Sequence, residues 1–110
     1  MGDSGYERLI RKWAYKIADE LGQLGRDAQR SIRSGDLSDA LEEARQVLIL
    51  ADQEDLAEEA RNLKVKVDML RSELASANQA GRYITRVKLA PTREEVLDLA
   101  RRIKSRMKWG

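Results

Sequence analysis

The apolar residues in the first third of the chain recur at steps of three or four residues. They are Tyr6, Ile10, Trp13, Ile17, Leu21, Leu24, Ala28 and Ile32. This period places all of them on one face of an α-helix. It therefore predicts a single amphipathic helix over about residues 4–33, with Asp3 or Ser4 as its N-cap.

Two glycines lie inside this stripe, at positions 22 and 25. In a helix interior each glycine costs about 1 kcal/mol relative to alanine. Because the stripe runs through Gly22 and Gly25 without interruption, the pattern favours a continuous helix against which another backbone packs closely. A kink near residues 22–25 is the alternative.

The stretch RSGDLSDALEEA, residues 33–44, has the features of a chain reversal followed by a new helix. Gly35 can end the first helix, and Asp36 or Ser38 can accept hydrogen bonds from the first N–H groups of the next one. A second helix is expected over about residues 37–51, with an inward stripe of Leu37, Leu41, Ala44, Leu48 and Ala51.

The hydrophobic stripe changes phase at Asp52, and the polar stretch 53–55 follows it. Acidic residues are favourable in the first turn of a helix, so this stretch indicates a short turn and a fresh start. A third helix is predicted over about residues 53–80. Its inward stripe comprises Leu56, Ala60, Leu63, Val67, Leu70, Leu74 and Ala77.

The segment RYITRVKLAP, residues 82–91, alternates apolar and polar side chains as a strand does, and LKVKVDML, residues 63–70, alternates too. A two-stranded element is therefore an alternative, but an isolated pair of strands is only marginally stable. We interpret residues 82–90 as an extended connection or as a frayed helical extension past Gly81.

The last helix is predicted over about residues 92–108. Pro91 is expected to end whatever precedes it, because proline lacks the backbone N–H that a helix interior needs. Thr92 and Glu95 then form the capping box T-x-x-E. The inward stripe of this helix is Val96, Leu99, Ile103 and Met107.

These elements describe one all-α domain over residues 1–110. Charged residues make up 36% of the chain, apolar residues make up 42%, and phenylalanine is absent, so the core must be aliphatic. We predict an antiparallel bundle of four, or at most five, helices, or a stack of helical hairpins, with a long first helix. The packing order and the oligomeric state are left open, and a homodimer is one alternative.

Charge is unevenly distributed along the chain, although the net charge is only +2. Residues 35–63 hold nine acidic and two basic side chains, whereas residues 64–110 hold twelve basic and five acidic ones. Either the C-terminal half presents a basic surface to an acidic partner or nucleic acid, or acidic and basic helices lie side by side and neutralise each other. The second interpretation is favoured.

A nucleic-acid contact would use the basic end of the last helix, with Trp109 stacking on a base. The cations concerned are Arg101, Arg102, Lys104, Arg106 and Lys108. They spread around the helix, and cations near a helix C-terminus are stabilising in any case. Nucleic-acid binding is therefore the lesser alternative.

The composition excludes much enzymatic chemistry, because histidine and cysteine are both absent. The commonest general base, the usual zinc ligands and the usual bundle di-iron motif are missing. The carboxylate pairs Glu42–Glu43, Glu58–Glu59 and Glu94–Glu95 are adjacent on a helix, so their members point apart. Nothing distinguishes Lys16 from a surface lysine. We predict no catalytic residue, no cofactor, no metal site and no enzymatic activity.

The longest apolar run, Val47–Ala51, is far shorter than the roughly 20 residues that span a bilayer. The N-terminal residues lack an apolar signal core. We therefore expect a soluble protein without a signal peptide and without membrane contact. Its compartment is unknown, and would be the cytoplasm for a chain expressed in a cell.

Residues 18–52 resemble one tetratricopeptide-type hairpin, since the turn at 34–36 is followed by Leu37, Ala40 and Ala44 on the second-helix pattern. Ala28 and Asp52 depart from the glycine and the terminating proline of that motif. A second Gly-Asp turn would fall near residues 69–70, where the sequence has Met-Leu in mid-stripe. The resemblance implies a single hairpin, and a peptide-binding groove needs neighbouring repeats.

The chain as a whole resembles a designed helical protein assembled from native-like helical fragments. Continuous stripes, one proline before a capping box, and the lack of His, Cys and Phe are typical of design. The internal glycines and the irregular segment 82–91 look inherited from natural pieces. This resemblance implies a structural scaffold with no biochemical activity of its own and no required partner. The alternatives are a helical protein–protein interaction module and a small nucleic-acid-binding domain.

Overall fold

The computed structural model describes residues 5–76 and 79–108, with side chains described except at 79–85. Within these residues the chain forms five α-helices and no strand. The helices are α1 (Gly5–Arg26), α2 (Ala28–Ser34), α3 (Asp36–Leu50), α4 (Glu54–Ala75) and α5 (Gln79–Met107). The prediction of an all-α protein is confirmed, and the two-stranded alternative for residues 63–70 and 82–91 is wrong.

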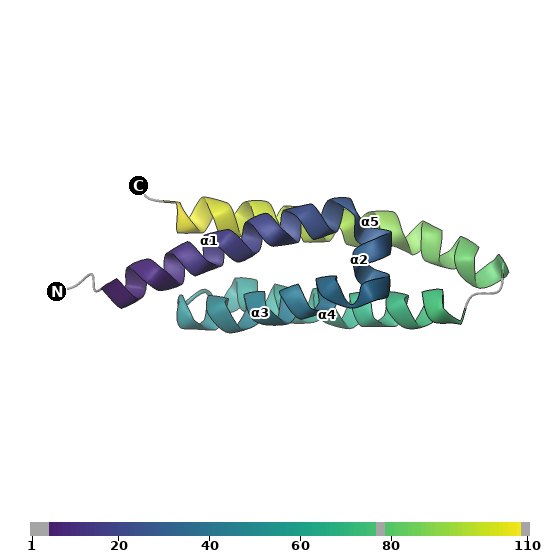
Figure 1. Ribbon diagram of the computed structural model, residues 1–110, viewed down its shortest axis with the longest axis horizontal. Helices are drawn as coiled ribbons and strands as arrows, with labels where there is room; N and C mark the ends of the chain where they lie inside the picture. Colours follow the sequence, from purple (N-terminus) through teal and green to yellow (C-terminus); the bar gives the residue numbers. More distant parts are fainter. Residues whose placement is uncertain (1–4, 77–78, 109–110) are drawn as a thin grey trace.

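The four long helices form an antiparallel up–down–up–down bundle (Figure 1). α1 packs against α3 and α5, and α4 packs against the same two helices from the other side. The short α2 crosses from the layer of α1 to the layer of α3. The result is a rod of 58 × 20 × 19 Å in which each long helix has two antiparallel neighbours.

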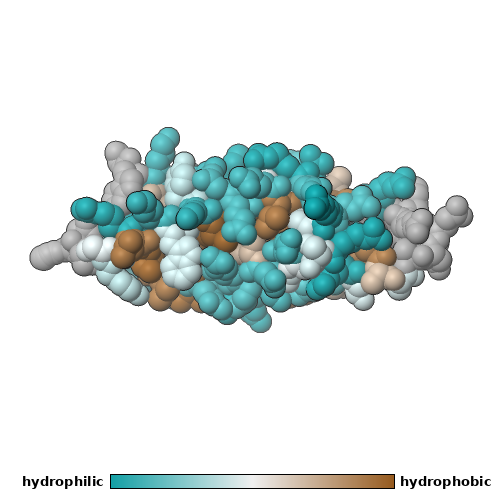
Figure 2. Space-filling model, viewed as in Figure 1, coloured by the Kyte–Doolittle hydropathy of each residue, from teal (hydrophilic) through white to brown (hydrophobic). Residues whose placement is uncertain are grey.

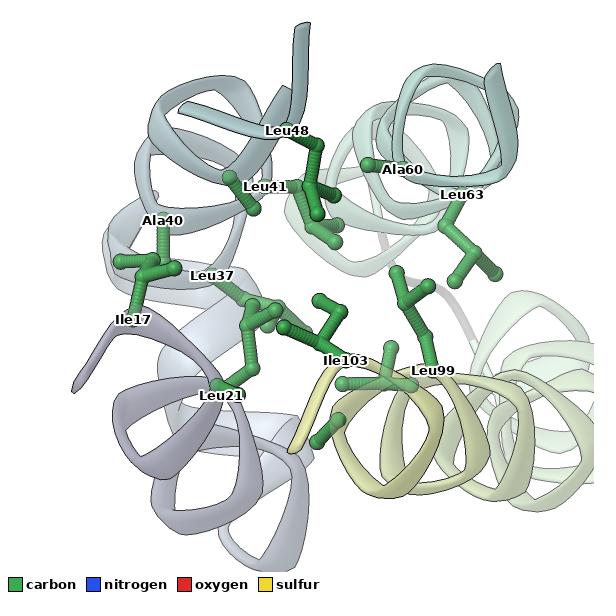
Figure 3. Close-up of a cluster of buried hydrophobic side chains, with 14 of the residues drawn as sticks. Ile17, Leu21, Leu37, Ala40, Leu41, Leu48, Ala60, Leu63, Leu99 and Ile103 are labelled. Carbon is green, nitrogen blue, oxygen red and sulfur yellow. The ribbon is translucent and has the colours of Figure 1, made fainter. Parts of the chain in front are cut away.

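The centre of the bundle is filled by aliphatic side chains from all four long helices (Figure 3). Burying a leucine or isoleucine side chain contributes about 1.5–3 kcal/mol relative to leaving it exposed, so this core is the main source of stability. The larger core residues that are completely shielded from solvent are Leu21, Ile32, Leu37, Leu41, Val47, Leu48, Leu56, Val67, Val96, Leu99 and Ile103.

The predicted continuous helix over residues 4–33 is wrong, because the chain breaks at Asp27, where φ is −111° and ψ is 51°. The Ser31 hydroxyl donates a hydrogen bond to the Leu24 carbonyl, at 2.8 Å, and so satisfies an acceptor that the break leaves free. Ala28 and Ile32 remain buried after the break. The hydrophobic stripe therefore stays in phase across it, which is why periodicity alone did not reveal it.

The two internal glycines of α1 differ in their surroundings. A Cβ atom at Gly25 would lie 3.0 Å from Leu97 Cδ2 and 3.1 Å from Val96 Cγ1, so α1 approaches α5 closely there. A Cβ atom at Gly22 would find only Arg26 Nη2, at 4.0 Å. α5 therefore packs closely on Gly25, but with side chains and not with the expected backbone, and nothing packs closely on Gly22.

Gly35 ends α2 in the left-handed conformation, as predicted, with φ at 87° and its N–H donating to the Ile32 carbonyl at 3.2 Å. The Arg71 guanidinium of α4 covers this glycine, and its Nε donates to the Arg33 carbonyl at 3.3 Å. α2 therefore terminates under a side chain from the opposite side of the bundle.

Neither Asp36 nor Ser38 caps α3 with its side chain, contrary to expectation. The Ser34 hydroxyl accepts the Asp36 N–H at 3.2 Å, and the Ser38 hydroxyl donates instead to Asp68 of α4 at 2.7 Å. The predicted turn after α3 is confirmed: Asp52 adopts a positive φ of 61°. α4 then begins at Glu54 and ends at Ala75, earlier than the predicted residue 80, while Ala77 lies outside the described residues.

Residues 82–90 are helical, so the extended connection is wrong, and the helical alternative holds except that the helix belongs to α5 and does not extend α4. The predicted start of a last helix at residue 92 is wrong. α5 runs through Pro91, which lies in its interior. Proline leaves the Val87 carbonyl without its helical donor, but Val87 is exposed, so water can reach it. The ion pairs Lys88–Glu73 and Lys66–Glu95 attach α5 to α4 on both sides of the proline.

The expected capping box does not form, because Thr92 lies inside a helix and not at its start. Its side chain is buried against the bundle. Glu95 accepts hydrogen bonds from Lys66 Nζ of α4, at 2.9 and 3.2 Å, and no capping bond to the Thr92 N–H is seen. Thr92 thus packs against the bundle, and Glu95 contacts α4, so the T-x-x-E pattern does not act as a cap here.

Gly35→Ala is expected to lower the free energy of unfolding by about 1–2 kcal/mol, because an L-residue is strained at positive φ. The new Cβ would also lie 3.0 Å from Arg71 Nη1. Gly22→Ala is the matched control and should stabilise the protein by about 1 kcal/mol, since that position is helical and open. Urea unfolding followed by circular dichroism measures both. Equal effects of the same sign would contradict this account.

Candidate functional site

The basic residues near the end of α5 face different neighbours and do not form one patch. Arg102 makes a two-pronged ion pair with Glu59 of α4 and a 3.0 Å bond to Asp98. Arg106 Nη1 lies 2.7 Å from Asp55 Oδ2. These two residues are therefore directed at α4.

The remaining members of the predicted nucleic-acid contact lie elsewhere. Lys104 forms an ion pair with Asp19 of α1, and Arg101 lies 3.9 Å from Asp98 on its own helix. Lys108 is exposed, and Trp109 lies outside the described residues. The structure thus does not bring the five cations together into a basic surface.

Four ion pairs join α4 to α5, and they are placed in register. In order along α4, the pairs are Asp55–Arg106, Glu59–Arg102, Lys66–Glu95 and Glu73–Lys88. Successive partners are four, seven and seven residues apart on each helix, and the residue numbers rise along α4 while they fall along α5. This is the spacing expected for flanking charges of two antiparallel helices that meet on a heptad repeat.

Two of these ion pairs, Asp55–Arg106 and Glu59–Arg102, join the acidic segment 35–63 to the basic segment 64–110, and the other two lie within residues 64–110. The hydrogen bond from Arg106 lowers the pKa of Asp55, and the hydrogen bond to Glu59 raises the pKa of Arg102. The interpretation that acidic and basic helices lie side by side is therefore confirmed for the first turns of α4 and the last turns of α5. Exposed ion pairs contribute only about 0–1 kcal/mol each, so their main effect is on the choice of register.

The adjacent carboxylates serve separate contacts, as their spacing predicted. Glu42 accepts hydrogen bonds from Arg45 and Gln46, and the bond from Arg45 is the largest cause that lowers the pKa of Glu42 to about 2. Glu43 instead accepts the indole N–H of Trp13 across the α1–α3 contact, at 2.8 Å. No acid–base pair is formed by these two neighbours.

The other two carboxylate pairs behave in the same way. Glu58 lies 3.6 Å from Arg61 on the same helix, whereas Glu59 points to α5. Glu95 contacts Lys66, while Glu94 is exposed. Neither pair places its two carboxylates in one contact.

An apolar patch at one end of the bundle was missed by the sequence analysis. Tyr6 and Trp13 were assigned to the inward stripe, but they are 61% and 40% exposed. Leu9, 65% exposed, lies beside them on α1. The bond between Trp13 and Glu43 fixes the register of α1 and α3, so Leu50, two turns beyond Glu43, lies level with Tyr6.

Figure 2 shows brown, hydrophobic surface at the end of the bundle where α1 begins and α3 ends. We call the group Tyr6, Leu9, Trp13 and Leu50 the apolar patch. The indole N–H of Trp13 could have indicated that this residue lies at the surface, because a buried tryptophan needs a polar partner that an aliphatic core cannot supply.

Other features relevant to function are few among residues 5–76 and 79–108. No three acidic side chains there gather closely enough to hold a metal ion. None of the helices in this part of the chain is both long and apolar enough to cross a membrane. Lys16 is exposed on α1, beside a groove that faces the last turn of α5.

Comparison with known proteins gives no relative for this chain. No protein-family model matches it, and no match is found among curated proteins or solved structures.

Stability should fall in acid, because Glu42, Asp55 and Asp68 have lowered pKa values in the folded state. Burial raises the pKa of Asp68, but hydrogen bonds from Ser38 and Lys64 outweigh it. The ordinary values are 4.5 for Glu and 3.8 for Asp, and Glu42 is lowered to about 2. The stabilisation is therefore complete above about pH 5 and is lost as the pH falls towards 2.

The urea midpoint measured from pH 7 to pH 2 tests this. Asp68→Asn should lower the midpoint at pH 7 and should weaken its dependence on pH below 4, because one of the three titrating carboxylates is removed. A midpoint of the native protein that stays constant down to pH 2 would contradict the role given to these carboxylates.

Proposed function

We propose that this protein is a helical scaffold whose role is structural, of the kind obtained when native-like helical fragments are joined by design. The observation that carries the proposal is the closure of the core. The inward stripes of α1, α3, α4 and α5 bury one another, and most of the large aliphatic side chains on them are completely shielded from solvent. Such a bundle uses its hydrophobic surface for its own folding.

The regularity of the α4–α5 contact supports this proposal. The four ion pairs keep a heptad spacing on both helices, and the core residues Leu56, Ala60, Leu63, Val67, Leu70 and Leu74 keep the same period between them. Agreement between hydrophobic pattern and charge pattern is a device by which designed bundles specify one register. The irregular features, Pro91 inside α5 and the break at Asp27, resemble inherited fragment ends.

A thermal melt followed by circular dichroism tests the scaffold proposal, on a sample whose mass is determined by light scattering. We expect a monomer that stays helical above about 90 °C, outside the usual range of mesophilic domains. Leu41→Ala is the matched destabilised variant. It should cost about 2–5 kcal/mol and should bring the transition into the measurable range. A native melt at 45–65 °C would count against a designed scaffold.

The apolar patch favours a second candidate function, a helical interaction module that binds a second copy of the chain. Three large side chains on one face of α1 and one on α3 lie within a few turns of each other and are 40–65% exposed. Large exposed apolar groups that cluster in this way are typical of protein–protein contacts, whereas single ones are normal on any surface.

Light scattering over a range of protein concentrations tests the second candidate. If copies associate through the patch, the native protein should be dimeric at high concentration and Leu9→Lys should be monomeric. Val65→Lys is the control, because Val65 is also more than half exposed but lies on α4, away from the patch. Monomers in all three samples, or dimers in all three, would exclude the patch as the interface.

A further inference from the structure

A groove of about 560 Å³ opens between α1 and the C-terminal turn of α5. It lies at the end of the bundle where α1 begins and α5 ends (Figure 1). Arg11 Nη2 donates to the Arg106 carbonyl at 3.1 Å, and this bond fixes the two helices on one side of the groove. The volume is within the range of about 300–1,000 Å³ that is usual for small-molecule sites.

The walls of the groove are largely apolar. Met107 is almost completely buried and forms part of the lining from α5, and the Tyr15 ring, partly exposed, lines it from α1. The methylene chains of lysine side chains extend such apolar surface while their ammonium groups stay in water. A flat, apolar body can therefore be covered here.

The rim of the groove is positive. Lys12, Lys16 and Lys108 line it, and no ion pair joins any of these three to another residue in the described part of the chain. The one acidic lining residue, Asp19, is already occupied by Lys104, which lies 5.5 Å from the centre of the Tyr15 ring. The carbonyl end of α5 adds some negative charge, and Arg11 compensates it through its bond to Arg106.

From this geometry we infer that the groove binds a small anionic amphiphile, an aromatic ring system that carries one sulfonate or carboxylate group. The rings would lie against Tyr15 and Met107, and the anionic group would reach the ammonium groups of Lys12 and Lys16. Lys108 would approach from α5. This binding site goes beyond the scaffold role and does not depend on it, because a monomeric bundle presents the same groove.

The test is a fluorescence titration of the full chain with 8-anilinonaphthalene-1-sulfonate as the probe. We expect saturable binding of one probe per chain. The double variant Lys12→Glu/Lys16→Glu should raise the Kd at least tenfold, because both groups that face the sulfonate are reversed in charge. The double variant Arg30→Glu/Arg93→Glu changes the net charge equally at exposed positions outside the groove, and its Kd should stay within twofold of the native value.

A second probe separates the charge from the rings. N-phenyl-1-naphthylamine has the same aromatic system without the sulfonate, so it should bind more weakly than the sulfonate to the native protein. Its Kd should also be unaffected by Lys12→Glu/Lys16→Glu. Circular dichroism of each variant confirms that the bundle is intact before binding is measured.

Three results would overturn the inference. The first is non-saturable binding of the sulfonate, or binding of several probes per chain. The second is an equal loss of affinity in both double variants, which would show attraction to the overall charge only. The third is equal affinity for the neutral and the anionic probe, which would show that the lysines take no part.

Discussion

Burial of four narrow aliphatic stripes is the constraint on which the rest of this structure depends. Each long helix carries most of its large aliphatic side chains on one face, and one neighbour alone cannot cover that face. A ring of four antiparallel helices gives every stripe two neighbours and a shared centre (Figure 3). Without phenylalanine, that centre is filled by leucine, isoleucine, valine, alanine and methionine, and close contacts such as that at Gly25 become possible.

The period of the apolar residues was enough to predict the class of fold and the inward faces of α3 and α4, and the glycine at position 35 was enough to predict the end of a helix there. The period was not enough to place the break at Asp27, because Ala28 and Ile32 keep the phase of the preceding stripe. The expectation that proline ends a helix failed at Pro91, where contacts with α4 on both sides keep α5 helical despite the lost hydrogen bond. The error at Pro91 arises because tertiary contacts override a local preference.

The surface was less predictable than the core. The distribution of charge along the sequence indicated that oppositely charged helices meet, but not which faces of α4 and α5 do so. The groove beside Tyr15 combines residues of α1 with the last turn of α5, and the apolar patch combines α1 with α3. Neither could be read from one helix alone, because each depends on the register between two helices that are distant in sequence.

The contact between α1 and α5 has a topological consequence. These are the first and last helices in the chain, yet they are neighbours, and the bond from Arg11 to the Arg106 carbonyl brings their outer ends together. All four neighbouring pairs of long helices in the ring are therefore antiparallel. The chain connects the helices within three of these pairs, and the pair α1–α5 is held by contacts between the helices alone. A circular permutant could close the open side with a short linker and begin at the turn around Asp52, because packing of this kind does not depend on which helix comes first.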